Sequence, residues 1–289
     1  MQPVLANWLV LAYLLVSALA LAIYTLALAH LAPQNYGEDL LHFILALSTG
    51  LFALWLYSRY VRRHSAEIRW RPARAGEALE LSLYLILFGL GFTAFVGSWA
   101  PPEYLKRLAE LVSFNHPLGL LFAVINIALF VPLVEEWIFR GFMLESYRRR
   151  KGAVFALYAQ ALIFGLLHGE VLTDAGAFFI GLILGRYLLS GGSLYAAFVA
   201  HAANNLASAL GVAFDIPFLR PDTPTTPAVG LLGLLLLAAV VLRTARRYPV
   251  RPEPPTEPGP VVSLSLIVAL FIGVLLTASS GAELFAGLK

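Results

Sequence analysis

The stretch LGLLFAVINIALFVPLVEEWIFRGFML, residues 118–144, is apolar over a length that can cross a lipid bilayer. A transmembrane helix needs about 20 predominantly apolar residues, because each residue advances the helix by about 1.5 Å. The stretch nevertheless carries Glu135, Glu136 and Arg140. Ionisable groups are costly in hydrocarbon, and those found there usually face the protein interior or a water-filled cavity. The stretch therefore predicts a membrane helix with a polar face turned toward other helices.

The composition of the whole chain indicates the same class. Of the 289 residues, 60% are hydrophobic and 13% are charged, and the mean hydropathy is +0.79. These values predict an all-α, polytopic transmembrane helical bundle, because a membrane barrel would alternate apolar and polar residues along its strands. The chain contains no cysteine, which excludes disulfides, thiolate metal sites and a cysteine nucleophile. The net charge of +3 is small and its arginines cluster in loops, which favours topology control over nucleic-acid binding.

Eight to nine apolar segments divide the chain. We expect spans at residues 5–31, 39–61, 78–99, 117–147, 152–169, 175–190, 193–214, 227–246 and 262–280. The sequence has no recognisable soluble domain or internal repeat, so residues 1–289 are expected to form a single membrane domain. The proline-rich segment 247–260 predicts an extended linker before the last span. The amphipathic segment 101–114 predicts a helix on the membrane surface.

Basic residues are concentrated in alternate loops. Segments 59–76, 148–151 and 243–251 hold six, four and four of them, whereas the intervening loops hold few. Positively charged loops stay on the cytoplasmic side of a membrane. We therefore expect a multi-pass integral membrane protein of a prokaryotic cell membrane, with its N-terminus in the cytoplasm. With nine spans, its C-terminus would lie on the other side.

The hairpin around the basic turn 148–151 brings two ionisable groups to similar depth. Glu135 lies 13 residues before Arg148, and His168 lies 17 residues after Lys151. At about 1.5 Å per residue, each group is roughly 20–25 Å from the turn. In an antiparallel hairpin, these two side chains can therefore lie within reach of each other.

The two adjacent glutamates are expected to have different roles. Glu136 and Arg140 are four residues apart on one helix face, so they are predicted to form an ion pair. Glu135 points about 100° away around the helix and remains available for chemistry. Pro132 lacks a backbone donor and favours a kink that can open a cavity beside Glu135.

Polar residues also mark one face of each of two later spans. Gln160, Phe164 and His168 recur at helical spacing in segment 152–169. In segment 193–214, His201 and Asn205 share a face, and Asn204 lies near it. A carboxylate with an imidazole can activate a water molecule, and a second histidine with a carboxamide can donate hydrogen bonds to an oxyanion. The set predicts a hydrolase that acts on an acyl bond, with a peptide bond as the expected target.

Three ordered motifs make the prediction more specific. EEWIFR (135–140) fits EExxxR, FGLLH (164–168) fits FxxxH, and HAANN (201–205) fits HxxxN. In this order and on separate spans, they resemble the CPBP family, which comprises CaaX prenyl endopeptidases and related bacteriocin-processing or immunity proteins. The resemblance covers approximately residues 117–245, which we expect to form the catalytic core.

The resemblance implies a role for each matching residue. Glu135 would be the general base, with His168 as its partner, and His201 with Asn205 would form the oxyanion site. Supporting residues would be Glu136, Arg140, Phe164 and Asn204; Asn204 is an extra amide that leaves the identity of the amide donor open. The substrate would be a membrane-associated peptide or protein, including a prenylated one.

Two questions stay open at the level of sequence. Glu135, His168 and His201 could alternatively bind Zn²⁺, but HExxH is absent and no further carboxylate is free to act as the base, so we favour a mechanism without cofactor. Buried Glu and His residues also occur in ion- or proton-coupled transporters, although no inverted repeat supports that alternative. A non-catalytic immunity or scaffold protein is a third reading, which the intact residue set disfavours.

Overall fold

A computed structural model describes residues 2–30, 37–64, 70, 72–110, 116–220 and 222–287. In chain order its elements are α1 (Pro3–His30), α2 (Gly37–Leu56), the π-helical segment η2 (Tyr57–Val61), α3 (Ala75–Val96), α4 (Pro102–Glu110), α5 (Pro117–Val124), the π-helical segment η3 (Ile125–Phe130), α6 (Val131–Glu135), the π-helical segment η4 (Glu136–Met143), α7 (Leu144–Lys151), α8 (Ala153–Leu166), α9 (Val171–Leu189), α10 (Leu194–Ala213), α11 (Pro227–Arg247) and α12 (Leu264–Gly287). The described residues contain no strand, which confirms the predicted all-α class.

Among the described residues, eight helical stretches are long and apolar enough to cross a membrane. They cover Pro3–Ala27, Asp39–Val61, Gly76–Val96, Pro117–Lys151, Val171–Leu189, Leu194–Ala213, Pro227–Arg247 and Leu264–Leu284. Helix α8, with 14 residues, is a shorter apolar pass between α7 and α9. The expectation of a polytopic bundle with eight to nine spans is therefore confirmed, and the protein is an integral multi-pass membrane protein.

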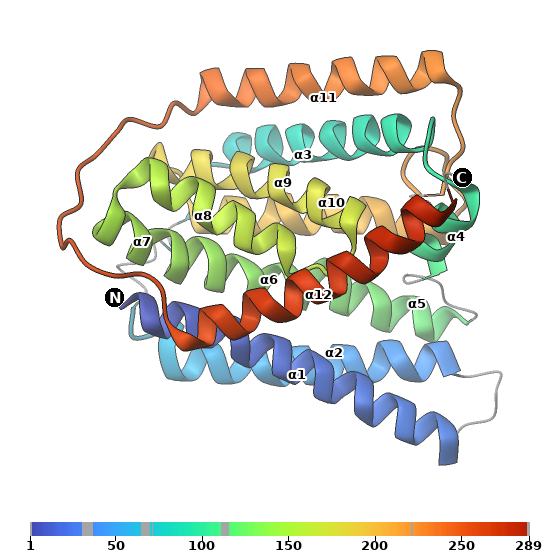
Figure 1. The fold of residues 1–289 in the computed structure, drawn as a ribbon, viewed down its shortest axis with the longest axis horizontal. Coiled ribbons are helices and arrows are strands. Elements are labelled where there is room, and N and C mark those ends of the chain that lie inside the picture. Colours follow the sequence, from blue (N-terminus) through green and yellow to red (C-terminus); the bar gives the residue numbers. More distant parts are fainter. Residues whose placement is uncertain are drawn as a thin grey trace.

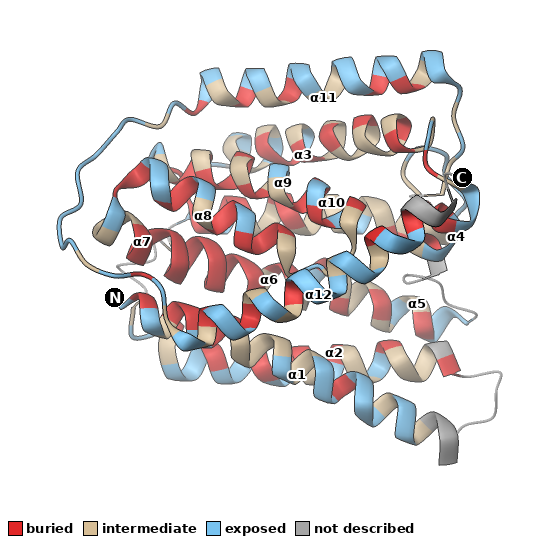
Figure 2. Ribbon diagram, in the orientation of Figure 1, coloured by how far each residue is buried: buried red, intermediate tan, exposed pale blue. Residues whose placement is uncertain are grey.

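The helices run mostly along one long axis, with the segment α5–α7 at the centre (Figure 1). Helices α3 and α11 pair on one side of it, and α1 and α2 pair on the other. Helices α8, α9 and α10 fill the space between α3 and the central segment, and α12 crosses the bundle obliquely. Figure 2 shows buried residues concentrated on α6 and α7, whereas the outer helices carry many exposed residues. Large apolar side chains such as Leu19 and Leu232 are exposed there, as lipid contact requires.

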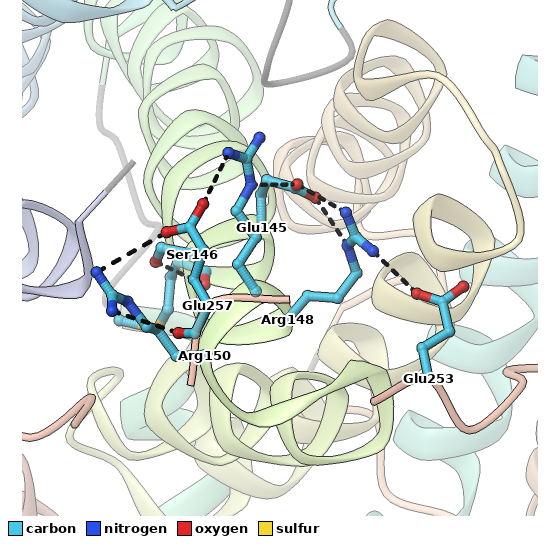
Figure 3. Close-up of polar contacts among 8 residues, drawn as sticks. Glu145, Ser146, Arg148, Arg150, Glu253 and Glu257 are labelled. Carbon is cyan, nitrogen blue, oxygen red and sulfur yellow. Dashed lines mark hydrogen bonds and ion pairs between the residues drawn. The ribbon is translucent and has the colours of Figure 1, made fainter. Parts of the chain in front are cut away.

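The proline-rich segment after α11 is bound to the basic turn at the end of α7 (Figure 3). Arg148 Nη1 donates to Glu253 at 2.9 Å, and Glu257 lies 3.8 Å from Arg149 and 3.9 Å from Arg150. The backbone N–H of Glu257 also donates to the carbonyl of Arg149 at 2.9 Å. Exposed ion pairs contribute about 0–1 kcal/mol each. Their effect here is to hold the linker that leads to α12 against the end of α7.

Helix α4 packs its apolar face against other helices of the protein. The predicted amphipathic helix at 101–114 is observed at Pro102–Glu110, and residues 111–114 lie outside the described residues. Tyr104 and Leu105 are buried against residues of α3, α9 and α12. The apolar face that suggested membrane contact is therefore used for helix packing.

Candidate active site

A helix irregularity beside Pro132 creates the attachment point for α10. In segment η3 the N–H of Val131 donates to the carbonyl of Asn126, five residues earlier. The next donor in this pattern would be residue 132, but proline has no N–H. The carbonyl of Ile127 is thus left without that bond, and Asn205 Nδ2 donates to it at 3.0 Å. This contact fixes the central segment against α10.

The predicted pair of Glu136 and Arg140 is present in the protein interior. Arg140 Nη1 lies 3.2 Å from Glu136 Oε1, and both side chains are fully buried. Glu136 Oε1 also binds His201 Nδ1 at 2.9 Å, a contact between α10 and the central segment that the local spacing did not predict. Glu136 is therefore shared between the arginine and a histidine of the HxxxN motif.

Both glutamates approach the same imidazole ring. His201 Nε2 lies 3.8 Å from Glu135 Oε2, whereas the sequence had suggested His168 as the partner of Glu135. Glu135 is 8% exposed, and its Oε2 atom has no hydrogen-bond partner among the described residues. A buried carboxylate oxygen without a partner is uncommon and needs an explanation. The first glutamate of EExxxR thus presents an unpaired oxygen beside His201.

Phe164 of the FxxxH motif connects the charged pair to both histidines. The Arg140 guanidinium carbon lies 4.0 Å from the centroid of the Phe164 ring, in cation–π geometry. The rings of Phe139, His168 and His201 meet Phe164 edge-on, with centroid distances of 5.0, 4.8 and 6.0 Å. Among the described residues the guanidinium nitrogens make no hydrogen bond, so Glu136 and this ring are the contacts that offset its charge.

His168 lies just beyond α8, because the helix ends at Leu166 and not at residue 169 as predicted. Its Nδ1 contacts the Phe164 carbonyl at 2.8 Å. A carbonyl oxygen only accepts, so Nδ1 carries the hydrogen and the neutral ring has its lone pair on Nε2. Gly169 has a φ of +70°, which lets the chain turn into α9 at once. The lone pair of His168 is thereby available at the start of that turn.

The glycines at 165 and 169 have different structural roles. A Cβ on Gly165 would come within 2.7 Å of the Asp174 carbonyl, so this glycine permits the approach of α9. Gly169 lies outside α8 and would instead meet Leu276 of α12. Gly165 is therefore a helix-packing glycine, and Gly169 is a turn glycine.

One cavity of about 500 Å³ brings the residues of the three motifs together. Its lining includes Glu135, Phe164, His168, His201, Asn204 and Asn205. The remaining lining is largely apolar and comes from α3, α4, the central segment, α9, α10 and the segment between α10 and α11. Asn204 Nδ2 contacts Asn205 Oδ1 at 3.4 Å, so the two amides lie side by side in the wall.

The segment between α10 and α11 forms part of the cavity rim in a strained conformation. Asp215 and Phe218 have φ angles of 58° and 65°, and Phe218 lines the cavity. The Phe218 N–H donates to Thr223 Oγ1 at 3.1 Å. Arg220 pairs with Asp215 and Asp222, and its hydrogen bond to Asp222 raises the pKa of Arg220. A bulky residue with positive φ is uncommon, and such strain often occurs at ligand sites.

The arrangement does not fit the Zn²⁺ site considered for Glu135, His168 and His201. Among the described residues, no group of three His, Cys, Asp or Glu side chains has its donors close enough to hold a metal ion. His201 Nδ1 is engaged by Glu136, and its Nε2 faces Glu135. The mechanism proposed below therefore contains no metal-dependent step.

Comparison with known families agrees with this geometry. Residues 117–207 match the family model described as type II CAAX prenyl endopeptidase Rce1-like. This part of the chain is therefore similar to the Rce1-like domain of the CPBP family. Searches of the curated proteins and of the solved structures found no significant match.

The matched region spans the central segment α5–α7, α8, α9 and the first part of α10. All residues of the three motifs fall within it, whereas α3 and the rim segment, which complete the cavity, lie outside it. At the level of the family, the domain supports a membrane endopeptidase acting on a membrane-associated substrate.

Proposed function

We propose that the protein is an intramembrane endopeptidase that hydrolyses a peptide bond with a water molecule activated by Glu135. The observation that carries this proposal is the unpaired Oε2 atom of Glu135, which lies at the cavity beside His201 Nε2. The Glu135 side chain is 10% exposed and lines the cavity, although its Oε2 atom is itself buried. A carboxylate in this position can accept a proton from a water molecule that enters the cavity. The lone pair of His168 Nε2, in the same cavity, would help to orient that water.

The bond changes follow from these positions. Glu135 takes a proton from water as the water oxygen bonds to the carbonyl carbon of the substrate. The resulting oxyanion accepts a hydrogen bond from the second N–H of Asn205, whose first N–H is used by Ile127. The carbon–nitrogen bond then breaks, and the proton held by Glu135 passes to the leaving amine.

His201 would assist at the oxyanion through its protonated ring. The Glu136 carboxylate at Nδ1 stabilises a positive charge on the imidazole, as the aspartate does in a serine protease triad. Nε2–H of that ring can then donate toward the oxyanion. In this proposal Glu136, Arg140, Phe164 and Asn204 are positioning residues, because their contacts run to other protein groups.

The substrate class follows from the family and from the cavity wall. An apolar lining suits a membrane-associated peptide or protein with apolar side chains near the scissile bond, and it also suits a prenylated one. The motif residues supply everything this mechanism requires, so we propose that it runs without Zn²⁺ or another cofactor.

A cleavage assay on purified protein tests the proposal. A peptide library in detergent should yield products with the wild type and with Glu103→Gln, which changes an exposed carboxylate of α4. Glu135→Gln should give no product while keeping the wild-type elution profile and Tm. Full activity of Glu135→Gln would contradict the proposed base. Failure of every peptide to be cleaved would favour the transporter or scaffold readings.

A further inference from the structure

The basic loops all lie at one end of the bundle. Helices α2, α7, α9 and α11 end there, and α3, α8, α10 and α12 begin there (Figure 1). Two contacts join these ends: Arg247 of α11 donates to Glu80 of α3 at 3.1 Å, and Arg148 of α7 binds Glu253 at 2.9 Å. The described basic residues of this end are Arg59, Arg62, Arg63, Arg74, Arg148, Arg149, Arg150, Lys151, Arg186, Arg243, Arg246, Arg247 and Arg251. We call it the basic end.

The opposite end has a different charge pattern. It contains α4, the turn from α8 to α9, the rim segment between α10 and α11, and the end of α12. Thr225 N–H donates to the Gly97 carbonyl at 3.0 Å, and Tyr104 OH bonds Ser280 Oγ at 3.0 Å, which ties these parts together. Its described basic residues are Lys106, Arg107 and Arg220, and the two arginines are paired with carboxylates.

The cavity reaches only toward this opposite end. Its lining uses residues from Ile86 to Val96 of α3, from Leu172 to Ile180 of α9, and from His201 to Ala209 of α10. In each helix, this part is the one farther from the basic end. Leu108 of α4 and Phe218 of the rim extend the lining to the end of the bundle, where Phe218 is 38% exposed.

The path toward the basic end is filled by side chains. Below His201, Ala197 and Ala200 of α10 are fully buried. Phe139 and Phe142 of the central segment are 3% and 0% exposed. The polar floor of the cavity is thus separated from the basic loops by packed apolar residues.

We infer that the active-site cavity opens to the extracytoplasmic side of the membrane and takes peptides that have been exported to that side. Loops rich in arginine and lysine remain in the cytoplasm, which places the basic end inside and the cavity rim outside. The substrate is then a peptide with apolar side chains whose scissile bond enters from the outer leaflet. The statement that the substrate is a peptide rests on the proposed peptidase function. The side from which the cavity is reached follows from the fold and from the basic loops.

The inferred orientation also constrains what precedes the cleavage. A peptide made in the cytoplasm must first cross the membrane, so a translocation step must supply the substrate. A C-terminal segment presented from the cytoplasm would meet the packed basic end.

Single-cysteine labelling tests the side of access, since the natural chain contains no cysteine. The variants are Ile216→Cys on the exposed rim, Ser208→Cys in the cavity wall, and Thr256→Cys in the exposed linker at the basic end. The probe is a small, charged, membrane-impermeant methanethiosulfonate added to intact cells or to lysed membranes. Ile216→Cys and Ser208→Cys should react in intact cells, and Thr256→Cys should react only after lysis.

The opposite labelling pattern, or equal labelling of all three variants in intact cells, would overturn the inference. Labelling does not require turnover, so the same three cysteines are also placed in the Glu135→Gln background. If no peptide is cleaved but the labelling pattern is as expected, only the proposed peptidase function fails. If the enzyme is active but the labelling pattern is inverted, only the inferred orientation fails.

Discussion

Asn205 donates its side-chain amide to the backbone carbonyl of Ile127, at 3.0 Å. Pro132, five residues after Ile127, has no N–H to offer that carbonyl in the π-helical pattern of this segment. One N–H of the Asn205 amide therefore holds the structure together, and in the proposed mechanism the other N–H binds the oxyanion. This dual use allows the two roles to be separated experimentally.

Asn205→Ala should lower both stability and activity. Loss of the donor leaves the part-buried Ile127 carbonyl without this partner, and the cost is at most that of a fully buried group, about 1–3 kcal/mol. Adding Pro132→Ala restores an N–H near Ile127, so the double variant should recover part of the Tm but none of the activity. Thermal unfolding and peptide cleavage of the two single variants and the double variant complete the cycle. Recovery of activity together with Tm would mean that Asn205 has no direct part in catalysis.

Glu136→Gln should destabilise the protein more than Glu135→Gln does. It removes the counter-charge of the buried Arg140, and breaking a buried pair costs about 3–5 kcal/mol. Glu135→Gln alters a carboxylate at the cavity and should abolish cleavage with little change in packing. The yield of folded protein and the Tm in detergent measure the difference. Equal Tm values with equal residual activity would refute this division of roles.

Chelation should leave the activity intact. In the proposed mechanism Glu135 transfers the proton, His168 orients the water and His201 donates to the oxyanion, so exhaustive treatment with a chelator should change neither rate nor Tm. Metal analysis should find much less than one Zn²⁺ per chain. Stoichiometric zinc whose removal abolishes activity, and whose return restores it, would replace the metal-free mechanism with a metal-dependent one.

Phe218→Gly should affect substrate binding more than stability. Glycine adopts the φ of 65° without steric cost, which offsets its larger entropy loss on folding, so the Tm should stay close to that of the wild type. Removal of the ring from the cavity rim should raise the KM for apolar peptides and leave kcat nearly unchanged. Asp215→Gly, at a φ of 58° and outside the cavity lining, serves as the backbone control. An equal rise in KM for the control would assign the effect to loop conformation.

Local spacing predicted the contacts that lie within one helix. Glu136 and Arg140 are four residues apart on a continuous helical segment, and their ion pair could be deduced from that spacing alone. The contact between Glu136 and His201 joins residues 65 positions apart, so it depends on the packing of α10 against the central segment. No periodicity within either helix could have predicted it.

The position where α8 ends was also beyond local reasoning. Gly165 and Gly169 suit both a helix-packing strip and a helix terminus, and the apolar residues between them favour neither. The observed positive φ of Gly169 decides for the terminus. The contact between Asn205 and Ile127, by contrast, had a sequence signal: a proline within a membrane helix frees a carbonyl, and a nearby span must supply a donor.

Helix α8 has only 14 residues, so it spans about 21 Å, less than the hydrocarbon thickness of about 30 Å. Its outer face presents Phe155, Tyr158 and Leu162, which are 43%, 48% and 53% exposed. A helix this short thins the adjoining bilayer or draws head groups inward. His168, two residues past its end, is exposed and would then lie near the polar head groups. Turnover in reconstituted vesicles should therefore decline as the lipid acyl chains lengthen. A thicker hydrocarbon layer would cover the thinned part of the bilayer beside α8 and keep water away from His168.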